Sequence, residues 1–419
     1  MTTLYYAMSR LTILLNTPSF QQKFKLKPSA FTRNRKLTFP IVTGMILRMI
    51  KQSLQITCNW FGDFTESEPA SKQAFSLARQ KISPECFQAL HTDGLEANYK
   101  LNPQKGLWRG FRIIAADGST LRLPESEDLE NEFGRWPTRE GVNVSPPIAR
   151  ISEYTDIATK LVLSGRIAPC CTSEEELAKE QLTEVVQKMR SFGQKNLLFI
   201  YDRGYPSEEF INQHVELGVD FIFRVPRNFN KSISEIYRGK ERENFLITEN
   251  WPLLRVSQFT LPGGEDELLL TTLADERLFS QEALSEVYQG RWAAMEEGYK
   301  KQKITMQLEN FSGKTVTAIR QEYWATLTVG NLMEMGCIEI EGYWIPGALP
   351  KRHVNRSVIF GSMRDATMEA IFQMTSMEEY SAKFDRMAKR SMLKVRPGRN
   401  YSRASVGKPK NHHVYRRAC

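Results

Sequence analysis

The spacing of apolar and polar positions divides the chain into a helical first part, a middle part with strands and a helical last part. Within residues 1–100, apolar side chains recur at helix-like spacing over 41–56 and over 70–90. From residue 110 onward, short apolar runs typical of strands appear at 111–116, 149–154, 160–167, 196–201 and 219–225, and again within 226–280. Helical spacing lies between or after these runs, at 173–190, 206–214, 280–303 and 316–335. This order predicts an α/β protein with a mixed sheet.

Charge is distributed unevenly along the chain, whose formal net charge is +9 over 419 residues. Residues 1–100 hold 13 Lys and Arg against 6 Asp and Glu, and residues 383–419 hold 12 against 1, so the part between them carries a net charge of −9. Basic ends around an acidic middle favour a protein that binds a polyanion with its flanks and requires a cation between them. The alternative is that these charges only keep frayed termini in solution.

Neither the apolar runs nor the cysteines indicate export. The runs at 11–15 and 42–47 are far shorter than the roughly 20 residues that span a bilayer, and the first residues lack the pattern of a signal peptide. The six cysteines are scattered without a Cys-x-x-Cys pair, which argues against a zinc ribbon or a disulfide framework. We therefore expect a cytoplasmic protein without a membrane partner.

A short basic amphipathic helix is predicted from Ser71 to Ile82. It begins just after Pro69, a helix start signal, and its apolar positions recur at helical spacing among basic and polar ones. Such a helix is suited to lie in a groove of DNA as a recognition helix. The pattern fits equally well a helix of a small bundle whose basic face is only solvated.

Two aspartates stand directly after two apolar, strand-like runs. Asp117 follows 113–116, and Asp202 follows 198–201. If the two strands are neighbours, both carboxylates emerge at one edge of the sheet, where they can bind a hard cation such as Mg²⁺. Two such ions, roughly 3.5–4 Å apart, would polarise a scissile phosphate and stabilise the attacking and leaving oxygens. Taken singly, each acid has a simpler explanation; Asp-Gly, for example, is a common turn.

A third carboxylate for such a site is available on the helix predicted at 280–303. Glu296 and Glu297 are the candidates. Lys300 and Lys303 follow Glu296 by four and seven residues, so these three side chains share one helix face. An acid that holds metal, in line with two cations that hold phosphates, suits a phosphodiester substrate. Acid–lysine pairs four residues apart are also common as plain surface salt bridges.

Three stretches of the sequence resemble the motifs of the insertion-sequence-four family of DDE transposases. Residues Ala115 to Pro124 resemble its first aspartate motif and Tyr201 to Ser207 its second, and Tyr288 to Lys303 is similar to its Tyr-Arg-Glu-Lys helix. Residues 31–37, 309–314 and 396–399 also resemble this family. The three motifs occur in the family's order, and the likeness extends over nearly the whole chain.

The resemblance implies a ribonuclease-H-like core with a mixed sheet, and a β-rich insertion between the second and third acids. On this basis we expect five segments. They are a helical DNA-binding region (1–104), the first part of the core (105–225), the insertion (226–280), the second part of the core (281–350), and a C-terminal helical region with a basic tail (351–419).

The resemblance also implies the site and its chemistry. Asp117, Asp202 and Glu296 are the expected catalytic residues and ligands of two Mg²⁺ ions, for which Mn²⁺ can substitute. The side chains expected to contact DNA are Tyr288, Arg291, Trp292, Lys300 and Lys303, with the tryptophan stacking on a flipped base. Metal-activated water would cut double-stranded DNA at the terminal inverted repeats, and the freed 3′-hydroxyl would finally attack target DNA. A homodimer that pairs two ends in the bacterial cytoplasm is expected.

One departure from the family's pattern bears on activity. Four residues separate Arg291 from Glu296, whereas the family usually has three. Because each helical residue turns the chain by about 100°, the extra residue rotates Arg291 away from the face of Glu296. A π-bulge between them would absorb it; otherwise Arg291 has lost its role or the protein is impaired. Two alternatives therefore stand beside a transposase: a metal-dependent nuclease without strand transfer, and a catalytically impaired DNA-binding copy.

Overall fold

The computed structural model describes residues 2–33, 35–48, 51–136, 145–239, 243–246, 253–260, 266–343 and 351–395, with residues 243, 292 and 293 described by their backbone alone. Its first hundred residues are helical, as the apolar spacing predicts. The six helices are α1 (Thr3–Asn16), α2 (Pro18–Phe24), α3 (Phe39–Leu47), α4 (Leu54–Phe64), α5 (Lys72–Arg79) and α6 (Glu85–Leu101).

The helix-like spacing over 41–56 and 70–90 does not correspond to single helices, because each stretch is divided in two, whereas α5 confirms the short helix predicted from Ser71 to Ile82. The segment 41–56 contains the end of α3 and the start of α4, and 70–90 contains α5 and the start of α6. In the second case the break falls at Ser83-Pro84. A proline disfavours the helical conformation of the residue before it and begins a helix more readily than it continues one. Ser71 caps α5 by accepting a hydrogen bond from the amide of Ala74.

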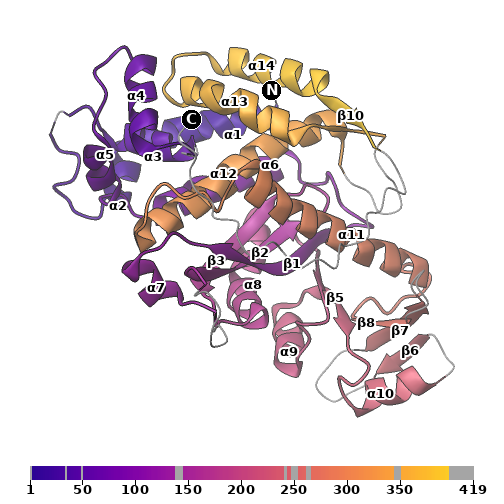
Figure 1. The fold of residues 1–419 in the computed structure, drawn as a ribbon. Coiled ribbons are helices and arrows are strands. Elements are labelled where there is room, and N and C mark those ends of the chain that lie inside the picture. The colour runs from indigo at the N-terminus through magenta and orange to yellow at the C-terminus, as the bar shows by residue number, and fades with distance from the viewer. Residues whose placement is uncertain are drawn as a thin grey trace.

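The middle of the chain forms one mixed sheet of eight strands, which confirms the predicted fold class (Figure 1). Its strands are β1 (Arg112–Arg122), β2 (Ile148–Asp156), β3 (Val162–Pro169), β4 (Leu197–Tyr201), β5 (Asp220–Val225), β6 (Glu243–Leu246), β7 (Leu254–Thr260) and β8 (Asp266–Thr271). The order across the sheet is β3-β2-β1-β4-β5-β8-β7-β6. Among the described strands of this sheet, the central β1, β4 and β5 run parallel and the other neighbouring pairs run antiparallel. The strands of the predicted insertion extend the edge of this sheet, and α10 (Lys231–Arg238) precedes them.

Helices cover both faces of the sheet. One face packs on α8 (Glu174–Ser191) and α9 (Glu208–Leu217), and the other on α11 (Gln281–Lys300) and α12 (Val316–Glu341) (Figure 1). Two neighbours in β2 show this alternation. The hydroxyl of Tyr154 donates to the carbonyl of Ala178 in α8, whereas the carboxylate of Glu153 accepts from Tyr323 in α12. Between β1 and β2 lies the short α7 (Glu127–Phe133).

Helix α12 is the centre of the molecule. All its residues from 321 to 338 are buried, and it packs on α1, α3, α6 and the C-terminal α14 (Met377–Arg390). The remaining elements of this region are β9 (Arg352–Val354), α13 (Arg356–Ile371) and β10 (Met392–Lys394). Among the helices that the structure describes, none is long and apolar enough to cross a membrane. The predicted basic tail beyond residue 395, which includes the stretch 396–399 that was expected to resemble the family, lies outside the described residues.

A buried ion pair fixes α5 to α12. Arg79, on α5, is 2% exposed, and its Nη1 lies 3.1 Å from Oε1 of Glu322. The same guanidinium donates to Gln321, to the hydroxyl of Ser312 and to the carbonyl of Ala318. The amide of Ser312 also donates to the Glu322 carboxylate. The segment 309–314 thus joins the N-terminal helices to the core.

Candidate active site

The structure brings Asp117 and Asp202 to the same edge of the sheet. Parallel β1 and β4 are paired from Arg112 opposite Leu197 to Ala115 opposite Ile200, so Asp117 and Asp202 continue this register two residues further on. Asp202 directly follows β4, as predicted. The prediction that Asp117 lies beyond its strand is wrong, because β1 continues to Arg122 through antiparallel pairing with β2. Asp117 therefore lies where β1 extends past the end of its parallel neighbour.

Arg291 from α11 lies between the two aspartates. Its Nη2 is 3.3 Å from Oδ2 of Asp202 and its Nη1 3.9 Å from Oδ2 of Asp117, with the arginine side chain only 5% exposed. Tyr288, one turn earlier, donates its hydroxyl to Oδ1 of Asp202 at 3.0 Å. Both residues were predicted from the sequence to belong to the site. Despite the extra residue that follows it, Arg291 still contacts the two aspartates.

The two carboxyl groups differ in their affinity for a proton. Burial raises the pKa of Asp117 to about 6, against the opposing effects of Arg291 and the Gly118 amide. Burial acts on Asp202 in the same direction, but Arg291, a backbone amide and Tyr288 outweigh it and hold the pKa of Asp202 below its ordinary value. Arg224 adds to this effect, since it contacts both Asp202 and the buried Glu267. Asp202 is therefore the more firmly ionised of the pair.

Glu296 does not lie with the aspartates. Its carboxylate pairs with Lys300 at 2.8 Å, and the Lys300 side chain is 61% exposed. This is the acid–lysine pair four residues apart that the sequence left open as the simpler explanation, although the Glu296 side chain itself is only 29% exposed. The neighbouring Glu297 is 66% exposed and pairs with Lys160 at 3.4 Å. Lys300 and Glu297 line a cavity of about 530 Å³ between α11 and the segment of β9 and α13.

Lys303 contacts the same strand as the aspartate site. Its ammonium donates to the hydroxyl of Ser119 and the carbonyl of Thr120, at 2.7 and 2.6 Å. The chain here forms a π-helix, η1 (Lys301–Thr305), directly after α11. A π turn is therefore present, but it lies after Glu296 rather than between Arg291 and Glu296. The side chain of Trp292 lies outside the described residues, so its predicted stacking role stays a prediction.

The residues at this edge fit a divalent cation only in part. Asp117 and Asp202 offer carboxylate oxygens that remain 30% and 38% exposed, which suits Mg²⁺ or Mn²⁺. Over the described residues, however, no three His, Cys, Asp or Glu side chains are grouped as a metal site. The expected third ligand, Glu296, is turned to Lys300, and the positive charge between the two aspartates comes from Arg291. In this structure, two of the three expected ligands, Asp117 and Asp202, lie together at this edge of the sheet.

A buried acid that the sequence pattern did not single out lies next to this site. Glu153 lies opposite Asp117 in the β1–β2 pairing and is 2% exposed. Its carboxylate accepts from Gln302 at 2.7 Å and from Tyr323 at 3.2 Å. Tyr299 of α11 donates to the backbone carbonyl of Asp117 at 2.7 Å. An acid within the strand-like run at 149–154 was the available signal for Glu153.

Replacing Glu153 by glutamine should stabilise the protein at alkaline pH. Burial raises the pKa of Glu153 from 4.5 to about 7, so ionising it costs folding free energy as the pH rises through that interval. We expect Glu153→Gln to raise the free energy of unfolding by about 2–3 kcal/mol at pH 8 and to have little effect at pH 4. Urea denaturation at both pH values measures this, with the exposed Glu297→Gln as control. An equal effect at both pH values would contradict it.

Known proteins resemble this chain at low identity. "Putative transposase InsZ" of Escherichia coli strain K12 is 21% identical over 141 residues, and the match covers 34% of this chain and 44% of that protein. A structure of the piggyBac transposase synaptic complex with hairpin DNA covers 90% of this chain and 84% of its own, at 10% identity and a TM-score of 0.49. The Mos1 transposase paired-end complex with left transposon end covers 45% and 59%, at 11% identity and a TM-score of 0.19.

A family model gives the assignment. The model described as "Transposase DDE domain" matches residues 108–332, which is more than half of the chain. The match begins just before β1, ends within α12, and includes Asp117, Asp202 and the whole of α11. This family implies dependence on a divalent metal. The chain belongs to the transposase DDE domain family.

Proposed function

We propose that this protein is a DNA transposase of the insertion-sequence-four family, which cuts the ends of its element and joins them to target DNA. The observation that carries the proposal is the pair Asp117 and Asp202 at one edge of the sheet, with Arg291 between them, in a chain of the DDE family. We further propose that it acts as a homodimer on two terminal inverted repeats.

The site residues have separate roles in this proposal. Asp117 and Asp202 would hold Mg²⁺ or Mn²⁺, and the bound metal would polarise the scissile phosphate and activate the attacking oxygen. Tyr288 orients the Asp202 carboxylate through its hydrogen bond, and the largely buried Arg291 would stabilise negative charge on the phosphate. Glu296 would be the third ligand, although this role requires a change in the register of α11.

DNA binding is best supported on a surface formed by α5 and the loop before α3. A groove of about 630 Å³ is lined there by Arg33, Arg35, Lys36 and Lys81, and none of the described residues that line it is an acid. Leu77, in the exposed face of α5, is 68% exposed and lies among these cations. Phosphates attract such a cluster, and an exposed apolar side chain can contact the methyl group of thymine. We call these residues the α5 surface and propose that it binds the terminal repeat.

The salt dependence of DNA binding tests the α5 surface. Arg33→Ala and Lys81→Ala should each weaken binding of a terminal-repeat duplex and reduce the slope of log K against log salt by about 0.9 for each phosphate that the variant no longer neutralises. Fluorescence anisotropy at several salt concentrations measures the slope. Lys195→Ala is the matched control, because Lys195 is exposed in the loop before β4, away from this surface. Unchanged slopes for both α5-surface variants would place the DNA elsewhere.

A cleavage assay separates the proposed transposase from the alternatives. A labelled duplex that carries the element's terminal repeat is incubated with Mg²⁺ or Mn²⁺, or with EDTA, together with a target plasmid. Metal-dependent nicking at the repeat boundary followed by joining to the plasmid supports the transposase. Nicking without joining would indicate a nuclease, and binding without nicking would indicate an impaired copy.

A further inference from the structure

The segment from α11 to η1 is attached to β1 at two points. Upstream, Arg291 contacts Asp117 and Asp202; downstream, Lys303 donates to Ser119 and Thr120. Lys303 follows Arg291 by twelve positions, and at about 100° per residue an uninterrupted α-helix would turn Lys303 about 120° away from the direction of Arg291. A π turn takes up one extra residue and reduces this difference to about 20°. The π-helix at Lys301–Thr305 therefore accommodates the additional residue of this helix.

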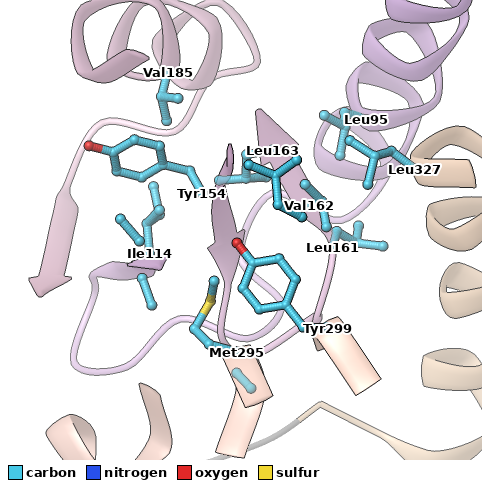
Figure 2. Packing of buried hydrophobic residues seen from close by; sticks show 14 of the residues in the cluster. Leu95, Ile114, Tyr154, Leu161, Val162, Leu163, Val185, Met295, Tyr299 and Leu327 are labelled. Carbon is cyan, nitrogen blue, oxygen red and sulfur yellow. The ribbon is translucent and has the colours of Figure 1, made fainter. Parts of the chain in front are cut away.

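The position of this π turn decides which side chain points to the aspartates. In the observed register, Met295 lies four residues after Arg291, about 40° from its direction, whereas Glu296 lies about 140° away. The side chain of Met295 is 2% exposed and, with that of Tyr299, reaches from α11 toward the strands (Figure 2). Glu296 pairs instead with the exposed Lys300. A methionine thus occupies the helical position at which a carboxylate would complete the metal site.

We propose that α11 has two registers and that moving the π turn upstream, to between Arg291 and Glu296, completes the site. Each residue from Glu296 to Lys300 then takes the place of its predecessor, so the Glu296 carboxylate replaces Met295 beside Asp117 and Asp202. The observed register is the resting one. It is stabilised by the burial of Met295 and by the hydrogen bond from Tyr299 to the Asp117 carbonyl. The proposal rests on the proposed function, since it assumes that these acids bind a divalent metal.

Deleting one of the adjacent alanines 293 and 294 removes the extra residue and should fix the completed register. Lys303 then follows Arg291 by eleven positions, which suits an uninterrupted α-helix, and Glu296 follows Arg291 by four. Because metal binding no longer includes the cost of the register change, we expect the full-length deletion variant to bind Mn²⁺ about tenfold more tightly than the wild type if about one molecule in ten occupies the completed register. Isothermal titration calorimetry without DNA measures this affinity independently of cleavage.

Glu296→Gln tests whether Glu296 causes the gain. In the deletion variant it should cancel the tenfold increase, and in the wild type it should weaken Mn²⁺ binding, because the wild type also recruits this carboxylate. A gain that survives Glu296→Gln, or a deletion variant that binds no more tightly than the wild type, would overturn the two-register proposal. The proposed metal-dependent function itself fails if Mn²⁺ binds neither the wild type nor the deletion variant. It also fails if Asp202→Ala leaves the Mn²⁺ affinity of both proteins unchanged.

A second variant keeps the test valid if the deletion prevents folding. Met295→Glu combined with Glu296→Gln leaves the chain length unchanged and puts a carboxylate at the position that faces the aspartates in the resting register. This double variant should bind Mn²⁺ more tightly than Glu296→Gln alone. Equal affinities would show that position 295 does not face the metal site, and the proposal would be withdrawn.

Discussion

Asp202→Ala should reduce DNA cleavage by at least about 10³-fold while terminal-repeat binding stays within about twofold. The loss follows from the role of the carboxylate, since a bound metal contributes several kcal/mol to the stabilisation of charge in the transition state. Binding should persist because the α5 surface carries the DNA contacts in our proposal and lies on a different element. Gel analysis of end-labelled duplex in Mg²⁺ measures cleavage, and anisotropy measures binding.

A second substitution of Asp202, with a control at Glu297, shows which property of the Asp202 carboxylate matters. Asp202→Asn keeps the shape and the hydrogen bond from Tyr288 but removes the charge, so it should be as inactive as the alanine variant. Glu297→Gln is the control, because its side chain is 66% exposed and pairs with Lys160 rather than with the site. If Asp202→Asn cleaves normally, the carboxylate serves only as a structural partner of Arg291.

Arg79→Ala should lower the free energy of unfolding by about 3–5 kcal/mol. The change leaves Glu322, only 4% exposed, as a buried charge without its cation, and it removes the donors that hold α5 on α12. Urea denaturation of the full-length protein measures the loss. Because Arg79 anchors α5 to α12, we also expect weaker binding of the terminal repeat, whereas the affinity for Mn²⁺ should stay the same.

The control for Arg79 is an exposed pair of the same chemistry. Lys389 and Asp385 lie 2.7 Å apart on α14 with 64% and 47% of their side chains exposed, so Lys389→Ala should cost about 0.5 kcal/mol or less. If Arg79→Ala costs no more than this control, the ion pair contributes nothing to the attachment of α5. Arg79→Lys should recover only part of the stability, because lysine lacks the planar fork that reaches several acceptors.

Local patterns in the sequence determined much of the site. An apolar strand that ends in an acid is recognisable without tertiary information, and this pattern identified Asp202. The helical spacing at 280–303 predicted the long helix that carries Tyr288 and Arg291. Both of these side chains contact Asp202 in the structure. The mixed sheet also followed from strand-like runs separated by helices, because periods of 2 and 3.6 residues reflect which face of each element is buried.

Tertiary contacts decided the features that depend on distant partners. The antiparallel pairing with β2 keeps Asp117 inside β1, although Asp-Gly alone suggests a turn. Arg79 belongs to a helix with a basic face in the sequence, but Glu322, far along the chain, makes it a buried anchor. The predicted helix at 41–56 is likewise interrupted, since helical spacing of apolar residues continues across the junction of two packed helices.

The direction of Glu296 is the clearest case of a property that the sequence left undecided. The sequence contains one residue more than the family usually has between Arg291 and Glu296, but it does not say where the helix takes up that residue. The attachments of Arg291 and Lys303 to β1 are long-range contacts that call for one extra residue of turn between them. The burial of Met295 and the hydrogen bond from Tyr299 to the Asp117 carbonyl accompany the observed position of that turn at Lys301–Thr305. The sequence alone shows which residues are acids. One residue of register corresponds to about 100° of helix rotation, so whether Glu296 points toward the two aspartates depends on how α11 packs on the sheet.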